Sequence, residues 1–355
     1  MRGVGVLVAL ASLAFGHPAM GRTLRVLSYN IHHSEGRDQV FDLDRIAGVI
    51  LAANPDVVAL QELDQGNERS GLDVFQLNQL AALTSRQGFF GKTINYSGGE
   101  YGNGVLIKSD LDVTRTINHA LPNPANREAR AVLEVRVSLD DDPDVDFSLF
   151  ATHLDANTDD TNRFAQAAFI NDLVDNSTTP ALLAGDMNTR PSSRTFARLA
   201  EQWADATNVA NPGGVAVTRG NQIDYIMYRR PQQWTVIEQG RFIVNTTTAV
   251  ASDHYPILSV LELRSPVADF DGDGVVGGSD FLIWQRGVGN GSSSAQGDAN
   301  GDDTVNGVDL THWKEQFGAV VELSSSALAT PEPSSVLLLS LVISACAYAR
   351  RRVRG

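Results

Sequence analysis

Polar side chains suited to metal binding and to hydrolysis stand where apolar runs of the chain end. Glu62, Asp186 and Asp253 supply carboxylates, and His153 and His254 supply imidazoles. Carboxylates and amides without thiolates form a hard oxygen-ligand set that suits Mg²⁺, Mn²⁺ or Ca²⁺ rather than zinc. Together such groups can bind a metal, activate water and neutralise a phosphate, which is what phosphoryl hydrolysis requires.

Six short stretches carry this chemistry in a fixed order along the chain. They are Ser28-Tyr29-Asn30, Gln61-Glu62, Thr152-His153-Leu154, Gly185-Asp186-Met187-Asn188, Ile223-Asp224-Tyr225 and Ser252-Asp253-His254. A single Asp, Asn or His after a strand is most often a turn former, a helix cap or a structural group. We therefore interpret the stretches as a set, because their combination is far more specific than any one of them.

Alternating strands and helices are needed to position these stretches. Runs rich in Val, Ile, Leu and Tyr predict strands at residues 24–31, 56–63, 104–108, 131–137, 147–153, 181–184, 223–228 and 257–263. Amphipathic spacing predicts helices at residues 42–53, 74–85, 162–174 and 192–202. Strands and helices mixed in this order predict an α/β domain, and strand ends are rigid positions for a site.

The ordered stretches resemble the endonuclease/exonuclease/phosphatase superfamily over roughly residues 24–263. The resemblance implies a DNase I-like α/β sandwich of four layers, in which two packed mixed β-sheets are flanked by helices. It implies a site at one end of the sandwich and hydrolysis of a phosphate ester with Mg²⁺ or Mn²⁺ as cofactor.

The resemblance also implies metal-binding and water-activating roles at matching positions. Glu62 would be the principal metal ligand, with Asn30 and Asp253 in or near the metal shell. Asp186 would orient or deprotonate the attacking water, and Asn188 would hold that water or a phosphate oxygen.

Four further positions would contact the phosphate or support a residue that does. His254 would contact the phosphate, with Asp224 hydrogen-bonded to its ring and favouring its charged form. His153 would donate to the phosphate or to the leaving oxygen, and Asn103 would lie beside the phosphate.

The chain departs from the superfamily pattern directly before Ile223. Related sequences often carry a basic residue there, whereas this chain has Asn221 and Gln222, which removes one candidate substrate contact. For the loop after Asn30 we expect a solvated segment rather than a substrate contact; it contains His32, His33, Glu35 and Arg37. The sequence does not assign the following arginines to the cleft or to the surface: Arg127, Arg130 and Arg163.

Two acidic units, 29 residues apart, follow the predicted α/β domain. An EF-hand-type calcium loop binds its ion through oxygen atoms at positions 1, 3, 5, 7 and 12, where position 7 uses its backbone carbonyl. In the first unit these positions are Asp269, Asp271, Asp273, Val275 and Asp280. In the second unit they are Asp298, Asn300, Asp302, Thr304 and Asp309. Position 12 is Asp rather than Glu in both units, and a short helix is predicted after each loop.

These two loop–helix units resemble a type I dockerin, which implies bound Ca²⁺ and a cohesin-type partner. Two alternatives remain at this stage. The module could be a calcium-stabilised spacer without a cohesin partner, or an acidic linker that binds no calcium.

The two ends of the chain indicate export. Residues 1–21 contain Arg2, an apolar run and small residues, as a secretory signal peptide does; the alternative is a buried N-terminal helix. Residues 331–355 contain Pro331-Glu332-Pro333, an apolar run and a final arginine cluster. This tail resembles a PEP-CTERM sorting signal, which implies processing by an exosortase-type enzyme and transient membrane contact; the alternative is a simple membrane anchor.

The predicted order is therefore a signal peptide (1–21), a hydrolase domain (22–265), a dockerin-like module (266–320), a linker (321–330) and a sorting tail (331–355). Either interpretation of the tail predicts a secreted or envelope protein exposed outside the cytoplasm. Cys346 is the one cysteine, so no disulfide forms within the chain.

Composition narrows the function further. Charged residues make up 20% of the chain, and the formal net charge is -14, which disfavours tight binding to long nucleic acid but not hydrolysis of a phosphodiester. A phosphodiesterase acting on nucleic acid or lipid head groups is favoured over a phosphomonoesterase because His153 offers an acid. A catalytically silent display or scaffold protein is the alternative from another class.

Overall fold

The computed structural model describes residues 22–139, 142–175, 177, 179–207, 222–229, 233–242, 246–264 and 266–321. The predicted signal peptide, almost all of the linker and the sorting tail lie outside these residues. Within the described part of the chain, no helix is both long and apolar enough to span a membrane.

The first sheet has the strand order β12-β13-β1-β2-β5-β4, with β3 paired to β2. Its strands are β1 (Arg22–Asn30), β2 (Val57–Asn67), β3 (Gly71–Phe75), β4 (Arg86–Tyr96), β5 (Gly99–Lys108), β12 (Trp234–Arg241) and β13 (Ile257–Leu263). Only β1 and β2 run parallel to each other, and α1 (Leu43–Ala53) forms the crossover between them. Asp42 caps this helix by accepting a hydrogen bond from the Arg45 amide.

The second sheet has the order β10-β11-β9-β8-β7-β6. Its strands are β6 (Asp112–Ala120), β7 (Ala131–Leu139), β8 (Asp142–His153), β9 (Ala181–Asp186), β10 (Trp203–Asp205) and β11 (Asp224–Arg229). Here β8 and β9 form the parallel pair, joined through α3 (Thr161–Val174). Each sheet thus contains one parallel pair, and the ends of a parallel pair meet at the same edge of the sheet.

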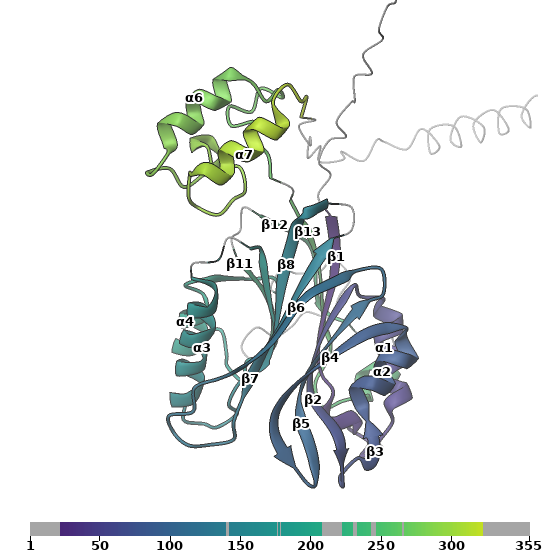
Figure 1. The fold of residues 1–355 in the computed structure, drawn as a ribbon. Helices are drawn as coiled ribbons and strands as arrows, with labels where there is room; N and C mark the ends of the chain where they lie inside the picture. Colours follow the sequence, from purple (N-terminus) through teal and green to yellow (C-terminus); the bar gives the residue numbers. More distant parts are fainter. Residues whose placement is uncertain are drawn as a thin grey trace, which may run out of the picture.

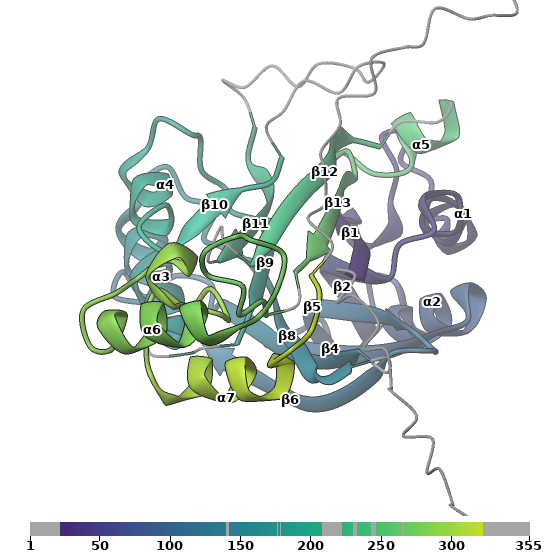
Figure 2. The ribbon, with the colours of Figure 1, turned by 90° about the horizontal axis from the view of Figure 1, so that it is seen from above.

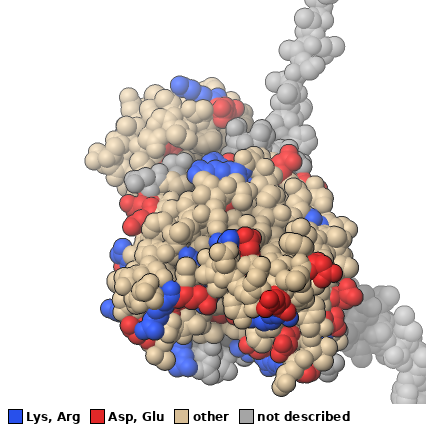
Figure 3. Space-filling view, turned by 60° about the horizontal axis from the view of Figure 1, so that its bottom comes forward, with Lys and Arg blue, Asp and Glu red and all other residues tan. Residues whose placement is uncertain are grey.

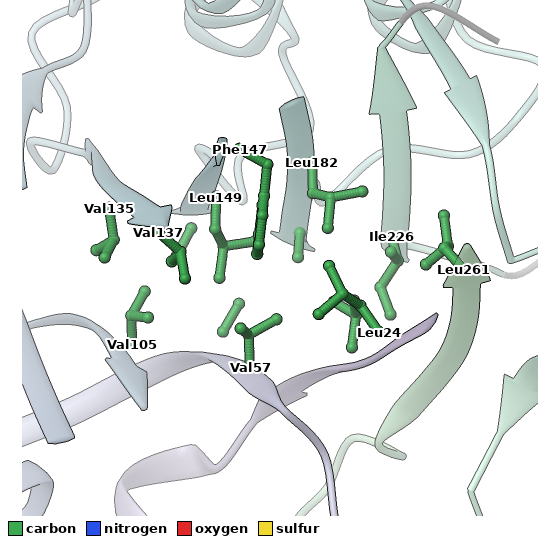
Figure 4. Packing of buried hydrophobic residues seen from close by; sticks show 14 of the residues in the cluster. Leu24, Val57, Val105, Val135, Val137, Phe147, Leu149, Leu182, Ile226 and Leu261 are labelled. Atoms are coloured by element: carbon green, nitrogen blue, oxygen red, sulfur yellow. The ribbon is translucent and has the colours of Figure 1, made fainter. Parts of the chain in front are cut away.

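The two sheets pack face to face, and helices cover both outer faces (Figure 1). α1 and α2 (Gln76–Thr84) lie against the first sheet, whereas α3 and α4 (Arg194–Leu199) lie against the second, on the opposite side of the molecule (Figure 2). Aliphatic side chains from both sheets fill the space between them, including Leu24, Val57, Leu149 and Leu182 (Figure 4). Alternate residues of each strand face this core, and the residues between them face outward toward the helices.

Two short segments complete the domain near the end of β1. The short 3-10 segment η1 (His32–Ser34) follows β1, and α5 (Thr246–Val250) precedes β13. The Arg37 amide donates to the Val250 carbonyl, which ties the loop after η1 to α5.

A small helical module follows β13 and contains α6 (Gly278–Gly287), η3 (Ser294–Gln296) and α7 (Gly307–Gln316). Each of its tryptophans bonds to the loop of the other unit: Trp284 Nε1 donates to the Asn306 carbonyl and Trp313 Nε1 to the Gly277 carbonyl. The module adjoins the end of β13 that pairs with the start of β1, since Leu263 lies opposite Arg22. It is therefore attached at the end of the sandwich far from Asn30 (Figure 1).

The predicted α/β fold of two mixed sheets flanked by helices is confirmed. The strands that carry the polar stretches and all four predicted helices are present, with boundaries shifted by a few residues. Strands β3, β4, β6, β10 and β12 were not predicted; β6 shows the reason, because most of its side chains are at least partly exposed.

Candidate active site

Strand register brings the predicted polar residues to one edge. In the first sheet Asn30 lies opposite Gln61, and in the second sheet His153 lies opposite Asp186. Asp224, the first residue of β11, also lies opposite Asp186. Residues far apart in sequence thus meet because their strands end at the same level.

Asp186 is the carboxylate on which the site converges. Its Oδ2 atom lies 3.3 Å from Asn30 Nδ2, 3.5 Å from His153 Nε2 and 3.7 Å from His254 Nε2. Its Oδ1 atom accepts from the Asn188 amide at 2.9 Å. Burial and then the charge of Asp224 raise the pKa of Asp186 to about 7, which suits a group that accepts a proton near neutral pH.

Glu62 reaches the site because β2 bulges there. The pairing of β2 with β5 shifts between Leu60 and Leu63, and Glu62 has a left-handed backbone with φ of +62°. Asn30 Nδ2 donates to Glu62 Oε1 at 3.0 Å as well as to Asp186 Oδ2, and so links these two carboxylates. Non-glycine residues adopt this conformation uncommonly, and backbone strain of this kind clusters at functional sites.

His254 is held as a cation by carboxylates. Its Nδ1 atom lies 2.9 Å from Asp224 Oδ2, so that the opposite edge of the ring faces Asp186. Burial acts to lower the pKa of His254, but the hydrogen bond to Asp224 and the surrounding carboxylate charges outweigh it and raise the pKa to about 10.

His153 is the opposite case. Arg130 Nη1 donates to His153 Nδ1 at 3.1 Å, so the ring is neutral and carries its proton on Nε2, which faces Asp186. Burial, followed by the charges of Arg130 and His254, holds the pKa of His153 well below its usual range. His153 therefore fits the role of a hydrogen-bond donor better than that of a proton source.

Asn188 and Asn103 are both fixed by backbone carbonyls. Asn188 has a φ of +47° and donates from Nδ2 to the Leu154 carbonyl at 3.1 Å, while its amide orients Asp186. Asn103 is buried in β5 and donates from Nδ2 to the Ala131 carbonyl at 3.0 Å. Both side chains are positioned firmly near the edge of the sheets.

Asp253 lies at the rim of the site rather than at its centre. Its side chain is 51% exposed, and its carboxylate lies 3.9 Å from His32 Nδ1. The Ser252 hydroxyl lies 3.3 Å from Asp253 Oδ1 and donates to the Asn30 carbonyl, which anchors this loop to the end of β1.

The expectation of a solvated loop after Asn30 is wrong for part of that loop. His32, His33 and Ser34 all have positive φ, and His33 and Ser34 are buried. The turn places both imidazoles beside Glu62, with ligand atoms of the three residues within 4.8 Å of one another. No periodic pattern in the sequence signals three consecutive left-handed residues, so this arrangement could not have been predicted.

Arg130 is the site residue that the sequence left unassigned. It is 8% exposed, reaches His153, and pairs with Glu128 at 3.2 Å. Burial first and then the charge of Glu62 raise the pKa of Tyr101, which places this β5 residue near the same charges. A lone arginine in a connecting loop carries no sequence signal that distinguishes it from a surface residue.

Two clusters in this region have ligand atoms close enough to hold a metal ion. One contains His32, His33 and Glu62, and the other contains Asp186, Asp224 and His254. Within the described residues Glu62 forms no ion pair, so its partly buried carboxylate lacks a compensating cation. A divalent metal would supply that charge, with the Glu62 carboxylate and the neighbouring imidazoles as candidate donors.

In the small module, the acidic loops fold around their first carboxylate. Asp269 accepts from the amides of Gly272 and Gly274, and its carboxylate lies within 4.8 Å of those of Asp271 and Asp273. Asp280 and Asp309, at position 12 of each loop, are buried and accept backbone amides at the start of α6 and α7. Position 6 has a left-handed backbone in both loops, at Gly274 in the first and at Asp303, with φ of +61°, in the second.

Fold and site together define a two-sheet α/β protein with carboxylates and histidines at one end of the sandwich. The model of the Endonuclease/Exonuclease/phosphatase family matches residues 27–254, more than half of the chain, and the chain belongs to that family. Members of this family hydrolyse phosphoester bonds and use divalent metal ions. A search of curated proteins gave no significant match.

Solved structures share the fold. An endonuclease/exonuclease/phosphatase from Beutenbergia cavernae is 26% identical, with a TM-score of 0.58, and the match covers 70% of this chain and 73% of that one. The human Nocturnin catalytic domain with a bound sulfate anion is 19% identical, with a TM-score of 0.55 and coverage of 68% and 94%. A mannosyl-6-phosphatase from Bacteroides thetaiotaomicron is 18% identical, with a TM-score of 0.52 and coverage of 67% and 99%.

Proposed function

We propose that this chain is a metal-dependent phosphodiesterase in which Asp186 activates the attacking water. The observation that supports this most strongly is the convergence of Asn30, His153 and His254 on one Asp186 oxygen, with Glu62 linked through Asn30. Few structural needs would bury a carboxylate between two histidines at the meeting edge of two sheets.

The chain's own groups divide the work of an in-line displacement. Asp186, buried and with a raised pKa, takes the proton of the water and is oriented by the Asn188 amide. The cationic ring of His254, aligned by Asp224, neutralises a phosphate oxygen. His153 donates a hydrogen bond from Nε2 to the phosphate or the leaving oxygen, and Arg130 fixes its tautomer.

Glu62 and Asn30, with Asp253 at the rim, are the residues that would hold Mg²⁺ or Mn²⁺. When bound, such an ion supplies positive charge that stabilises the developing charge on the phosphate. The uncompensated charge of Glu62 and its linkage to Asn30 support this assignment.

The test of this proposal also distinguishes two alternative functions. The neutral state of His153 weakens the argument from a general acid, so a phosphomonoesterase of the same fold is the first alternative. A catalytically silent display protein is the second. Hydrolysis of bis-p-nitrophenyl phosphate, p-nitrophenyl phosphate, plasmid DNA and sphingomyelin, with Mg²⁺ or Mn²⁺ and with EDTA, distinguishes them. Faster turnover of the diesters supports the proposal, faster turnover of the monoester supports the first alternative, and no turnover by folded protein supports the second.

We also propose that the chain is exported and that its small module binds Ca²⁺ through the two acidic loops. The convergence of Asp269, Asp271 and Asp273 supports calcium binding. A dockerin-like module would either bind a cohesin-type partner or act as a spacer. Pull-down with a cohesin in Ca²⁺ or in EDTA tests the binding of such a partner. Cleavage of the two ends on expression in an exporting host, measured by mass spectrometry, tests the signal and the sorting tail.

A further inference from the structure

Two arginine side chains make cation–π contacts with the same tyrosine ring beside the site. Arg37 Cζ lies 4.3 Å and Arg241 Cζ 4.9 Å from the centre of the Tyr255 ring. Together with Asp224 and His254 these residues line a pocket of about 230 Å³. The pocket therefore shares a wall with the proposed reaction centre.

Several arginines of the described chain pair with a carboxylate, but these two do not. Arg45 and Arg194 pair with aspartates at 2.7 and 2.6 Å. Arg37 instead donates to the neutral carbonyl oxygens of Ser252 and Asp253, at 3.2 and 2.7 Å. No carboxylate of a described residue lies within ion-pairing distance of Arg37 or Arg241. In a chain of net charge -14, two adjacent guanidinium groups without a carboxylate partner favour the binding of an anion.

The negative groups near the pocket are already engaged. Asp224 is hydrogen-bonded to His254, and the Asp253 carboxylate faces His32. Gln222, which also lines the pocket, donates to the Thr207 hydroxyl at 2.5 Å. Arg37 also donates from Nη1 to the Tyr255 hydroxyl at 2.9 Å, so the donors left for a ligand are those of Arg241 and the second N–H of each terminal nitrogen of Arg37.

Size and donor geometry define the ligand class. The pocket, at about 230 Å³, is smaller than the roughly 300–1,000 Å³ of sites that bind drug-sized molecules, which favours a small ligand. Guanidinium forks recognise phosphate by paired hydrogen bonds. A compact phosphoryl group matches both features.

We propose that Arg37, Arg241 and Tyr255 form a subsite for a second phosphoryl group of the substrate, next to the phosphate that is hydrolysed. This inference rests on the proposed function and makes it narrower. It predicts a preference for substrates with two neighbouring phosphates, such as phosphorylated nucleotide esters, over isolated diesters.

The test compares esters that differ by one phosphate. The substrates are thymidine 5′-(p-nitrophenyl phosphate) with and without a 3′-phosphate, and the 3′-(p-nitrophenyl phosphate) with and without a 5′-phosphate. The full wild-type chain should show at least one phosphorylated ester with kcat/KM about tenfold higher than its parent, mainly through a lower KM, since one charge-assisted contact has that scale. Turnover of all esters at equal efficiency would overturn the subsite while leaving the proposed function intact.

The main variant is Arg241→Gln, because Arg37 also braces the backbone that carries His254 and its loss would disturb the reaction centre. Arg241→Gln should remove the preference, and Arg241→Lys, which keeps the charge but not the fork, should retain part of it. Arg115→Gln removes an equal charge from exposed β6 and should leave the preference unchanged. A preference that survives Arg241→Gln, or is lost in Arg115→Gln, contradicts the assignment.

A binding measurement keeps the inference testable if no ester is hydrolysed, which would be a failure of the proposed function. Isothermal titration of wild type should give about tenfold tighter binding of thymidine 3′,5′-bisphosphate than of thymidine 5′-monophosphate. The difference should vanish in Arg241→Gln. Equal affinities in wild type would overturn the subsite.

Discussion

Asp224 and His254 show how single residues set the charge of the site. The two side chains are 2.9 Å apart, and the pair turns a histidine that burial would neutralise into a cation. On the other side of Asp186, Arg130 keeps His153 neutral. The two histidines both face Asp186 but differ in charge, because His153 is more deeply buried and its Nδ1 meets a guanidinium group, whereas Nδ1 of His254 meets a carboxylate.

Replacing Asp224 by Asn is expected to change the pH dependence of hydrolysis. A histidine whose pKa is raised to about 10 stays protonated at neutral pH, so the rate should fall only as pH rises through that value. Without the Asp224 charge the pKa of His254 falls, and the basic limb of the kcat/KM profile should move down by about one unit or more. An unchanged basic limb in Asp224→Asn would show that His254 does not govern it.

The residues that end strands were predictable, and those positioned by loops were not. Asp186 ends the apolar run of β9 and Asp224 begins that of β11, so their meeting follows from strand register. Arg130 and His33 reach the site through loop backbone, and for His33 through a left-handed turn with φ of +42°. Arg241 and Arg37 both contact the Tyr255 ring only because β12 pairs with β13 at the edge of the sheet. Such proximity between distant loop and edge residues has no sequence pattern.

At the scale of elements, the parallel pair β8–β9 holds the site together, and Gly185 makes its close approach possible. A β-carbon at Gly185 would overlap the Thr152 carbonyl oxygen, a backbone atom that cannot move aside. Gly185→Ala should lower the free energy of unfolding by roughly 2–3 kcal/mol and reduce activity, because it displaces Asp186. Chemical denaturation and kcat/KM measure the two effects.

Gly48→Ala is the matched control. This helical glycine of α1 has no atom within 4 Å of an added β-carbon, so alanine should be neutral or stabilising by about 0.5–1 kcal/mol. If Gly185→Ala behaves like Gly48→Ala, the tight approach of β8 to β9 is not needed.

Edge strands explain the part of the fold that sequence patterns missed. β6 and β12 are edge strands in which most residues are partly or fully exposed, and the pairing of each contains a bulge. A bulge breaks the alternation of apolar and polar residues on which strand prediction depends. The central strands are buried on both faces, and their continuous apolar runs gave a clear signal.

At the scale of the whole molecule, acidic and basic side chains are interspersed over the surface seen from the site end of the sandwich (Figure 3). Neither sign forms a broad continuous patch in that view, so the described residues of this face offer no extended basic track for a long polyanion. This agrees with small phosphate esters or short strands as substrates.

Calcium should order the small module without changing catalysis. Trp284 and Trp313 each bond to the loop of the other unit, so filling the loops should alter their fluorescence and raise the unfolding temperature of the module. The double variant Asp269→Ala/Asp298→Ala should abolish both responses. Because the module adjoins the far end of β13, kcat/KM of that variant should match wild type. Calcium-independent fluorescence in wild type would contradict calcium binding, and altered kcat/KM would contradict the separation of the module from the site.

The central claim is that Asp186 activates water in a metal-dependent hydrolysis, and the most direct measurement is turnover of bis-p-nitrophenyl phosphate by wild type and Asp186→Asn with Mg²⁺ or Mn²⁺. The amide has the shape of the carboxylate but cannot accept the proton, so kcat should fall by about 10²–10⁴-fold with the unfolding temperature maintained. EDTA should abolish wild-type turnover. Metal-dependent hydrolysis at an undiminished rate by folded Asp186→Asn would contradict the account.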